Sequence, residues 1–249
     1  MKHFWIGDVQ CRAGGKTNHL TAAGNYIVDK QPEVVVAAGD FWDIPSFSRH
    51  KTNLEREGLR IKKDIDAGIA GMSALLAPIE KYNKRRRKKY QPRKVFLCGN
   101  HEATIDRYVN EHPEMKGFLS FDSLGLKKFG WEVHPFLRPV RINGIYYAHY
   151  FYNPNNGRAY SGRAPNVLNS LGFSFTMGHR QGKDVAAKEM NNGKTIRGLI
   201  AGSFYQNYED YKGPQGNDHW QGCLMKHEVR DGNYDLLELS LDYLLRAWA

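Results

Sequence analysis

The sequence predicts an α/β protein in which two β-sheets pack as a sandwich with helices on the outside. Three short apolar segments in the first hundred residues each end at a glycine that polar side chains follow. The segments between them are helix-like, so these first strands should run parallel. The second half is rich in hairpins instead. A parallel half followed by a hairpin-rich half favours a mixed two-sheet sandwich, and without repeats or linkers we expect one domain over residues 1–249.

The first half yields the parallel part of the sheet. We expect a strand over residues 2–7, a loop over Asp8–Gly15, and a helix from Thr17 or Asn18 to about Asp29. The next strands are expected over residues 33–38 and 94–98. Between them, a polar loop over Pro45–Thr52 precedes a long helix. Its apolar residues recur at steps of three and four: Ile61, Ile65, Ile69, Met72, Leu76 and Ile79. Six consecutive cations, Lys84–Lys89, end this helix.

The second half is built from shorter elements. Residues 103–128 favour short helices broken at Pro113 and Gly117, and 153–166 favour a long loop. Asn143-Gly144 is a strong two-residue turn signal, so residues 139–142 and 145–149 should form a hairpin. Further strands are expected over Phe173–Met177, Thr195–Ala201, Gly222–Arg230 and Tyr234–Ser240, with a short closing helix around Leu241, Leu244 and Leu245.

Composition limits the class of protein. The chain has 249 residues and a formal net charge of +10, which draws a protein towards polyanions such as nucleic acid, although simple solubility explains it equally well. No apolar run approaches the roughly 20 residues of a membrane span, so we expect no membrane partner. Three cysteines without C-x-x-C spacing, and a strand at the N-terminus where a signal peptide would be, indicate a reducing, cytoplasmic location.

Polar side chains gather at the ends of the predicted strands. They are Asp8, Gln10, Asp40, Asp43, Asn100, His101, His149, His179 and Gln181. One such group could be a satisfied core residue, but groups at five successive strand ends need a common partner, and a divalent metal supplies one. The mixture of carboxylate, amide and imidazole suits Mn²⁺, Mg²⁺, Fe²⁺ or Zn²⁺.

The order of these motifs resembles a known family. The series D-x-Q, G-D-x-x-D, G-N-H-E, H and G-H-x-Q, over residues 5 to about 205, is similar to that of the calcineurin-like metallophosphoesterases, and in particular to short phage-encoded members. Their usual series is D-x-H, G-D-x-x-D, G-N-H-[DE], H and G-H-x-H. The resemblance implies a four-layer αββα fold, phosphoester hydrolysis, and the host cytoplasm as the location of a phage-encoded protein.

The resemblance also implies a role for each residue. Asp40 would bridge two metals. Asn100, His149 and His179 would complete one metal site, and Asp8, Gln10 and Gln181 the other. Hydroxide held by the metals would attack phosphorus. His101 would protonate the leaving oxygen as general acid, with Asp43 holding its tautomer.

Two positions depart from the family pattern. Gln10 and Gln181 stand where histidines are usual, and both belong to the same metal site. An amide oxygen is a weaker and harder ligand than imidazole, so preference should shift from Zn²⁺ towards Mn²⁺ or Mg²⁺. We therefore expect one tightly held metal, most simply Mn²⁺, and one weak or absent metal.

The substrate follows less directly from the sequence. The basic charge favours a phosphodiesterase or nuclease acting on DNA or RNA. Arg12, Arg49, His50 and Arg180 lie beside the motifs and are candidates for phosphate contact, or for pairing with surface carboxylates. The run Lys84–Lys89 either follows a phosphate backbone or is a solvated helix end. The alternatives are a phosphomonoesterase acting on a phosphoprotein or nucleotide, and a degenerate module that binds nucleic acid or protein without hydrolysis.

Overall fold

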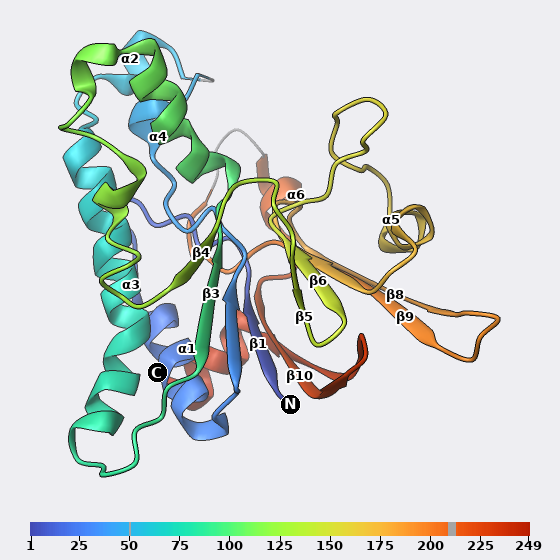
Figure 1. Ribbon diagram of the computed structural model, residues 1–249. Helices are drawn as coiled ribbons and strands as arrows, with labels where there is room; N and C mark the ends of the chain where they lie inside the picture. Colours follow the sequence, from blue (N-terminus) through green and yellow to red (C-terminus); the bar gives the residue numbers. More distant parts are fainter. Residues whose placement is uncertain (50, 209–212) are drawn as a thin grey trace.

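Two β-sheets face each other in the computed structural model, which describes residues 1–49, 51–208 and 213–249 (Figure 1). The first sheet contains β1 (His3–Ile6), β2 (Val34–Ala37), β3 (Arg93–Leu97), β4 (Glu132–His134), β10 (Gly222–Arg230) and β11 (Asn233–Ser240), in the order β11-β10-β1-β2-β3-β4. The second contains β5 (Val140–Ile142), β6 (Ile145–Ala148), β7 (Phe175–Met177), β8 (Lys183–Glu189) and β9 (Thr195–Ala201), in the order β5-β6-β7-β9-β8. The predicted mixed α/β architecture with two sheets is confirmed.

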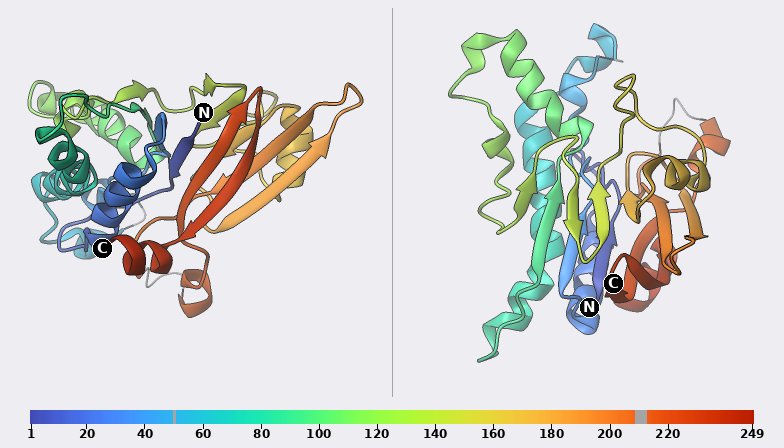
Figure 2. Two further views of the ribbon diagram at one scale, coloured as in Figure 1. Left: turned by 90° about the horizontal axis from the view of Figure 1, so that it is seen from below. Right: turned by 45° about the vertical axis from the view of Figure 1, so that its right-hand side comes forward.

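Helices cover the outer faces of both sheets, as the views in Figure 2 show. They are α1 (Asn18–Lys30), α2 (Asn53–Arg56), α3 (Ile61–Lys84), α4 (Asn100–Glu111), α5 (Ala164–Leu171), α6 (Gly213–Asn217) and α7 (Leu241–Trp248). Short 3₁₀ turns lie at Pro45–Phe47, Pro113–Met115 and Phe121–Leu124. Helices α1 and α3 pack on the first sheet, and α5 packs on the second. None of the helices that the structure describes is long and apolar enough to cross a membrane.

The alternation of side chains along β1 explains how one strand serves two cores. Phe4 and Ile6 point into the core beneath the helices, whereas Trp5 points into the core between the sheets. Strands β1, β2 and β3 pair in parallel, as predicted from the helical connections between them. Their carboxyl ends therefore meet at one edge of the sheet.

Helix α3 packs through small residues more than the predicted stripe suggests. Its buried face includes Gly68, Gly71 and Leu75, while Ile61 and Ile65 are only half-buried. A Cβ on Gly68 would lie 1.8 Å from the indole nitrogen of Trp42, so glycine is what lets that ring reach the helix. The sequence pattern located the helix correctly. It predicted a buried face made of large apolar residues, whereas glycines form part of that face.

Several elements were not predicted, among them the short helices α2 and α6. Strand β4 has only three residues. Strand β8 (KDVAAKE) is a charged edge strand without the apolar pattern expected of a strand, and it forms by pairing with β9. Helix α5 begins at Ala164, inside the predicted loop 153–166, and has Pro165 in its first turn. Prolines suit that position because its backbone N–H would have no helical partner. The hairpin across Asn143-Gly144 is confirmed, with Ile142 paired to Ile145.

Candidate metal centre

Glycines allow the polar strand ends to approach one another. A Cβ on Gly39 would lie 2.3 Å from the carbonyl oxygen of Leu97, and one on Gly99 would lie 2.1 Å from Asp40 Oδ1. A Cβ on Gly178 would lie 2.6 Å from Asp8 Oδ1. These distances are shorter than any real contact, so Gly39 leaves room for the backbone at the end of β3, and Gly99 and Gly178 leave room for the carboxylates of Asp40 and Asp8.

Three of the predicted ligands converge. One ligand atom from each of Asp40, His149 and His179 lies within 4.8 Å of the others, a grouping that could hold a metal ion. The three follow β2, β6 and β7. Asp40 and His179 both adopt positive φ, at 44° and 62°. Such backbone conformations are costly for residues other than glycine, and they cluster at functional sites.

The orientation of His149 defines the centre of this cluster. Its Nδ1 lies 2.9 Å from the carbonyl oxygen of Ala38, so Nδ1 carries the proton and donates it there. Its Nε2 then faces two oxygens, Asn100 Oδ1 at 2.9 Å and Asp40 Oδ2 at 3.3 Å. A nitrogen lone pair facing two oxygen acceptors is repulsive unless a proton or a cation lies between them. The group of Asp40, His149 and His179 could hold a metal ion, with Asn100 Oδ1 beside His149, and the carbonyl of Ala38 orients the imidazole as outer partners of metal-binding histidines do.

The residues predicted for the second metal site lie outside the group formed by Asp40, His149 and His179. Asp8 is buried, and its Oδ1 accepts a hydrogen bond of 3.1 Å from the backbone N–H of His179. Gln10 adopts positive φ at 49°, and its backbone N–H donates to the carbonyl of Asp40. Gln181 lies two residues beyond His179 in the loop after β7. Asp8 is thus adjacent to the three-residue cluster without belonging to it.

His101 lies at the first turn of α4, where Asp43 and Asp40 both face its ring. Nδ1 is 2.5 Å from the carbonyl oxygen of Asp43 and 3.5 Å from its carboxylate, while Nε2 is 3.8 Å from Asp40 Oδ2. The backbone N–H of His101 donates to Asp40 Oδ1 at 2.9 Å. Asp43 therefore faces the ring of His101 with both its backbone carbonyl and its carboxylate, and the carbonyl is the nearer group.

Charge and burial set the protonation of these groups. Burial by itself lowers the pKa of His149, but attraction to Asp40 outweighs it and raises the pKa to about 9. Burial would raise the pKa of Asp40, yet the charges of His149 and His101 hold it well below its usual range. Burial and the charge of His149 lower the pKa of His179 to about 4. Without metal, the cluster therefore holds a carboxylate, an imidazolium and a neutral imidazole at neutral pH.

The pKa values of two neighbouring groups, Asp8 and His101, are shifted by the same charges. Burial raises the pKa of Asp8 to about 8, a rise that the charge of Asp40 reinforces and that of His149 opposes. Burial would lower the pKa of His101, but the charges of Asp40 and Asp43 raise it. The direction of this shift favours the protonated form of His101 relative to a free imidazole.

Glu102, the last residue of the G-N-H-E motif, has a structural role that was not predicted. It is fully buried, and its two carboxylate oxygens accept from the backbone N–H groups of Gly99, Asp40, Phe41 and Trp42, at 2.8 to 3.1 Å. It thereby ties the end of β3 to the loop after β2. Its position three residues after the helix N-cap Gly99 is a readable signal, because glutamate there caps backbone donors.

Two further contacts were also missed. The ring of Tyr150 lies 4.8 Å from that of His179, so one of the aromatic residues near β6 packs directly on a candidate ligand. The side-chain amide of Asn207 donates to the carbonyl of Gln10 at 3.0 Å and holds the loop after β1. The sequence places Tyr150 among the aromatic residues next to His149, but its contact with His179 and that of Asn207 with Gln10 join segments distant in sequence.

The predicted phosphate-contact residues differ in where they lie. Arg12 is 3.9 Å from the carboxylate of Asp43, at the margin of the cluster. Arg49 pairs with Glu111 at the end of α4, and Arg180 donates to the carbonyl of Gly162. His50 lies outside the described residues. The role of these residues in binding phosphate stays a prediction.

Comparison with known proteins adds little to this geometry. No protein-family model matches the chain, and no curated protein matches it. One crystal structure aligns over 95% of this chain and 98% of its own, at 10% sequence identity and a TM-score of 0.34. A likeness that weak carries no argument about fold family or activity.

Proposed function

We propose that this protein is a metal-dependent phosphoester hydrolase of the calcineurin-like type, acting as a phosphodiesterase or nuclease on DNA or RNA. The observation that carries the proposal is the environment of His149, whose Nε2 faces the oxygens of Asn100 and Asp40. The order of motifs along the chain and the helices outside two facing sheets are in keeping with the four-layer αββα arrangement of that family.

One metal would be held by Asp40, Asn100, His149 and His179. A second, weaker metal would lie near Asp8, where Gln10 and Gln181 offer amide oxygens in place of imidazoles. When bound, a divalent metal lowers the pKa of water and neutralises charge on phosphoryl oxygens. Because the weaker site offers only oxygen ligands and the tight site offers oxygen and nitrogen ligands in equal number, we favour Mn²⁺ or Mg²⁺ over Zn²⁺.

His101 would act on the leaving group. Its Nδ1–H is engaged by the carbonyl of Asp43, so Nε2 is the atom that faces the metal cluster and would hold the proton to be transferred. Its ring is 30% exposed, which leaves it accessible to a substrate. The raised pKa of His101, caused by Asp40 and Asp43 in opposition to burial, keeps that proton available near neutral pH.

The test compares hydrolysis of labelled single-stranded DNA, bis-p-nitrophenyl phosphate and p-nitrophenyl phosphate with added Mn²⁺. We expect both diesters to be cleaved, and His101→Ala to lower kcat by at least about a hundredfold while Mn²⁺ binding is retained. Exposed His112→Ala is the matched control and should behave as wild type. Turnover of the monoester alone would move the assignment to a phosphomonoesterase. No hydrolysis of any of the three substrates, with metal still bound, would favour a degenerate binding module.

The asymmetry of the metal centre needs a separate experiment. Calorimetric titration with Mn²⁺ should show one tight and one weak event, because Gln10 and Gln181 weaken the site near Asp8. Gln10→His combined with Gln181→His should strengthen the weak event and leave the tight one unchanged. Two equally tight events in the wild-type protein would contradict the asymmetric site.

A further inference from the structure

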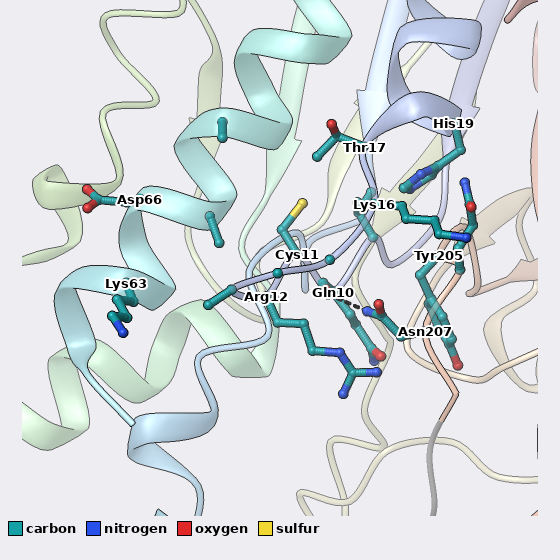
Figure 3. Close-up of a pocket in the computed structure, with 17 residues that line it drawn as sticks. Gln10, Cys11, Arg12, Lys16, Thr17, His19, Lys63, Asp66, Tyr205 and Asn207 are labelled. Atoms are coloured by element: carbon teal, nitrogen blue, oxygen red, sulfur yellow. Dashed lines mark hydrogen bonds between the residues drawn. The ribbon is translucent and has the colours of Figure 1, made fainter. Parts of the chain in front are cut away.

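A pocket of about 280 Å³ opens beside the metal centre and is not part of it (Figure 3). Its wall is formed by the loop after β1, the start of α1, one face of α3 and the segment around Tyr205. Gln10 borders both places, because it lines the pocket and its backbone donates to the carbonyl of Asp40 at 2.9 Å. The pocket and the metal centre therefore share the loop that carries Gln10.

The N-terminus of α1 faces the pocket without a capping side chain. Gly14, Gly15, Lys16 and Thr17 lead into the helix, and the N-cap Thr17 makes no side-chain capping bond. In α1, whose residues are all described, the first turn contains no acidic residue. The partial positive charge of the helix end is therefore not offset locally, which favours an anion there.

A buried histidine is the second observation that points to a ligand. His19 is 2% exposed and lines the pocket; among the described residues neither ring nitrogen makes a hydrogen bond, although the backbone of Phe204 interacts with the imidazole. Figure 3 shows its ring directed from α1 towards the Lys16 side chain. The ring also packs edge-on against Phe204, at 5.0 Å between centroids. Burying a polar group without a hydrogen-bond partner is unfavourable, so a ligand that accepts a hydrogen bond from this imidazole would relieve that cost.

The charges around the pocket favour an anion. Lys16 contributes a cation, and so does Arg12, which also faces the carboxylate of Asp43 at 3.9 Å; Lys63 and Asp66 line the pocket from α3, but Figure 3 shows their side chains extending away from Lys16. Asp66 is paired with Lys62 at 2.8 Å, so its charge is already compensated. The chain thus places cations, an uncapped helix end and an unsatisfied donor around one small cavity.

We propose that this pocket binds a phosphate group, namely the phosphate that flanks the reacting diester in an oligonucleotide substrate. This substrate assignment rests on the function proposed above, whereas the binding of phosphate does not. The backbone N–H groups at the start of α1, the Lys16 ammonium and the His19 imidazole are the donors. A flanking phosphate held here would place the next phosphate along the strand at the metal centre.

The first experiment measures phosphate binding without catalysis. Inorganic phosphate is titrated into the full chain in the presence of EDTA, and the ring nitrogen signals of His19 are followed by NMR. We expect a saturable shift that Lys16→Ala weakens about tenfold or more, since a charge-assisted contact is lost. Lys194→Ala removes an equally exposed lysine from the distant hairpin between β8 and β9 and should behave as wild type. No saturable shift, or equal affinity in Lys16→Ala, would overturn the phosphate site.

The second experiment identifies the source of the phosphate. KM is compared for a thymidine dinucleotide with and without a 5′-phosphate, both containing one diester bond. The 5′-phosphate should lower KM about tenfold in the wild type and in Lys194→Ala, and have no effect in Lys16→Ala. Equal KM values with the phosphate site intact would refute the substrate role and leave a site for free phosphate. Lys16-dependent phosphate binding in a protein that cleaves neither dinucleotide would overturn the proposed function and the substrate role, but not the site.

Discussion

At the scale of single residues, a proton and a metal ion would compete for one nitrogen, Nε2 of His149. His149 Nε2 faces Asn100 and Asp40, and its pKa of about 9 arises because Asp40 outweighs the effect of burial. A proton therefore occupies at neutral pH the place that a metal would take. Metal binding must displace it, since a metal ligand has to be deprotonated.

This competition predicts pH-dependent metal affinity. Between pH 6.5 and 9, apparent Mn²⁺ affinity should rise by up to about tenfold per pH unit, because His149 loses its proton more easily as pH increases. Calorimetry in buffers of different ionisation enthalpy should detect about one proton released for each tight Mn²⁺ bound at pH 7. His112→Ala should show the same release. Binding that is independent of pH over this range would show that His149 is not a ligand.

At the scale of elements, a single side chain couples β2, β3 and α4. Glu102 lies at the first turn of α4 and accepts from four backbone donors on the two strand ends. Phe41 and Trp42 are thereby held over the core, while Asp40 is turned towards the metal centre. The loop geometry depends on this carboxylate more than on any contact within the loop.

We expect Glu102→Gln to disturb both stability and the site. The amide keeps one acceptor oxygen but directs an NH₂ group at backbone donors, so unfolding free energy should fall by about 2 kcal/mol or more. Tight Mn²⁺ binding should weaken in parallel, because Asp40 is no longer held. Glu189→Gln on the exposed face of β8 is the matched control. Urea unfolding and Mn²⁺ titration of the two variants would decide this, and equal behaviour would argue against the coupling.

At the scale of the whole molecule, the most basic segment lies far from the candidate site. The run Lys84–Lys89 follows the end of α3 at the end of the first sheet opposite the strand tips (Figure 1). Arg86, two residues beyond the end of α3, stacks on Tyr82 in the last turn of that helix, 4.1 Å from the ring centre. This placement supports the solvated-helix-end interpretation and opposes direct contact with a phosphate near the metal centre.

Removal of this charge should leave short substrates unaffected. With Arg85, Arg86 and Arg87 replaced by serine, KM for a dinucleotide should stay within about twofold of wild type. Binding of long DNA should lose salt dependence only if the run touches the backbone, by up to about one unit of slope per phosphate contact. A large rise in dinucleotide KM would contradict the distance seen in the fold.

Buried histidines on either face of the first sheet give the molecule an acid sensitivity. Burial, together with the charge of Lys226, lowers the pKa of His3 to about 4, and burial lowers that of His19 to about 4. An unfolded chain binds these protons near pH 6.5, so the unfolded state gains protons first as pH falls. Each group therefore contributes stability above pH 6.5 that is lost as pH falls towards 4.

His19→Phe isolates one of these contributions. Between pH 7 and pH 4, the unfolding free energy of wild type should fall relative to that of His19→Phe by roughly 3 kcal/mol, as measured by urea denaturation. Comparing the two proteins cancels the contributions of the shifted pKa values at the metal centre, because both proteins contain those groups. His227→Asn, at a partly exposed site on β10, should show no such difference from wild type. A difference independent of pH would mean that His19 titrates normally in the folded chain.

The sequence by itself determined the alternating strands, the long helix, the Asn143-Gly144 hairpin and the polar residues at the strand ends. These follow from local rules of periodicity and turn chemistry, which act over a few residues. Only the tertiary structure decided that Asp40, His149 and His179 share one point, that Glu102 joins two strand ends, and that Lys84–Lys89 lies far from them. It also decided the strand β8, whose charged sequence pairs because β9 is beside it. Such facts depend on which distant segments pack together, and no local pattern records that.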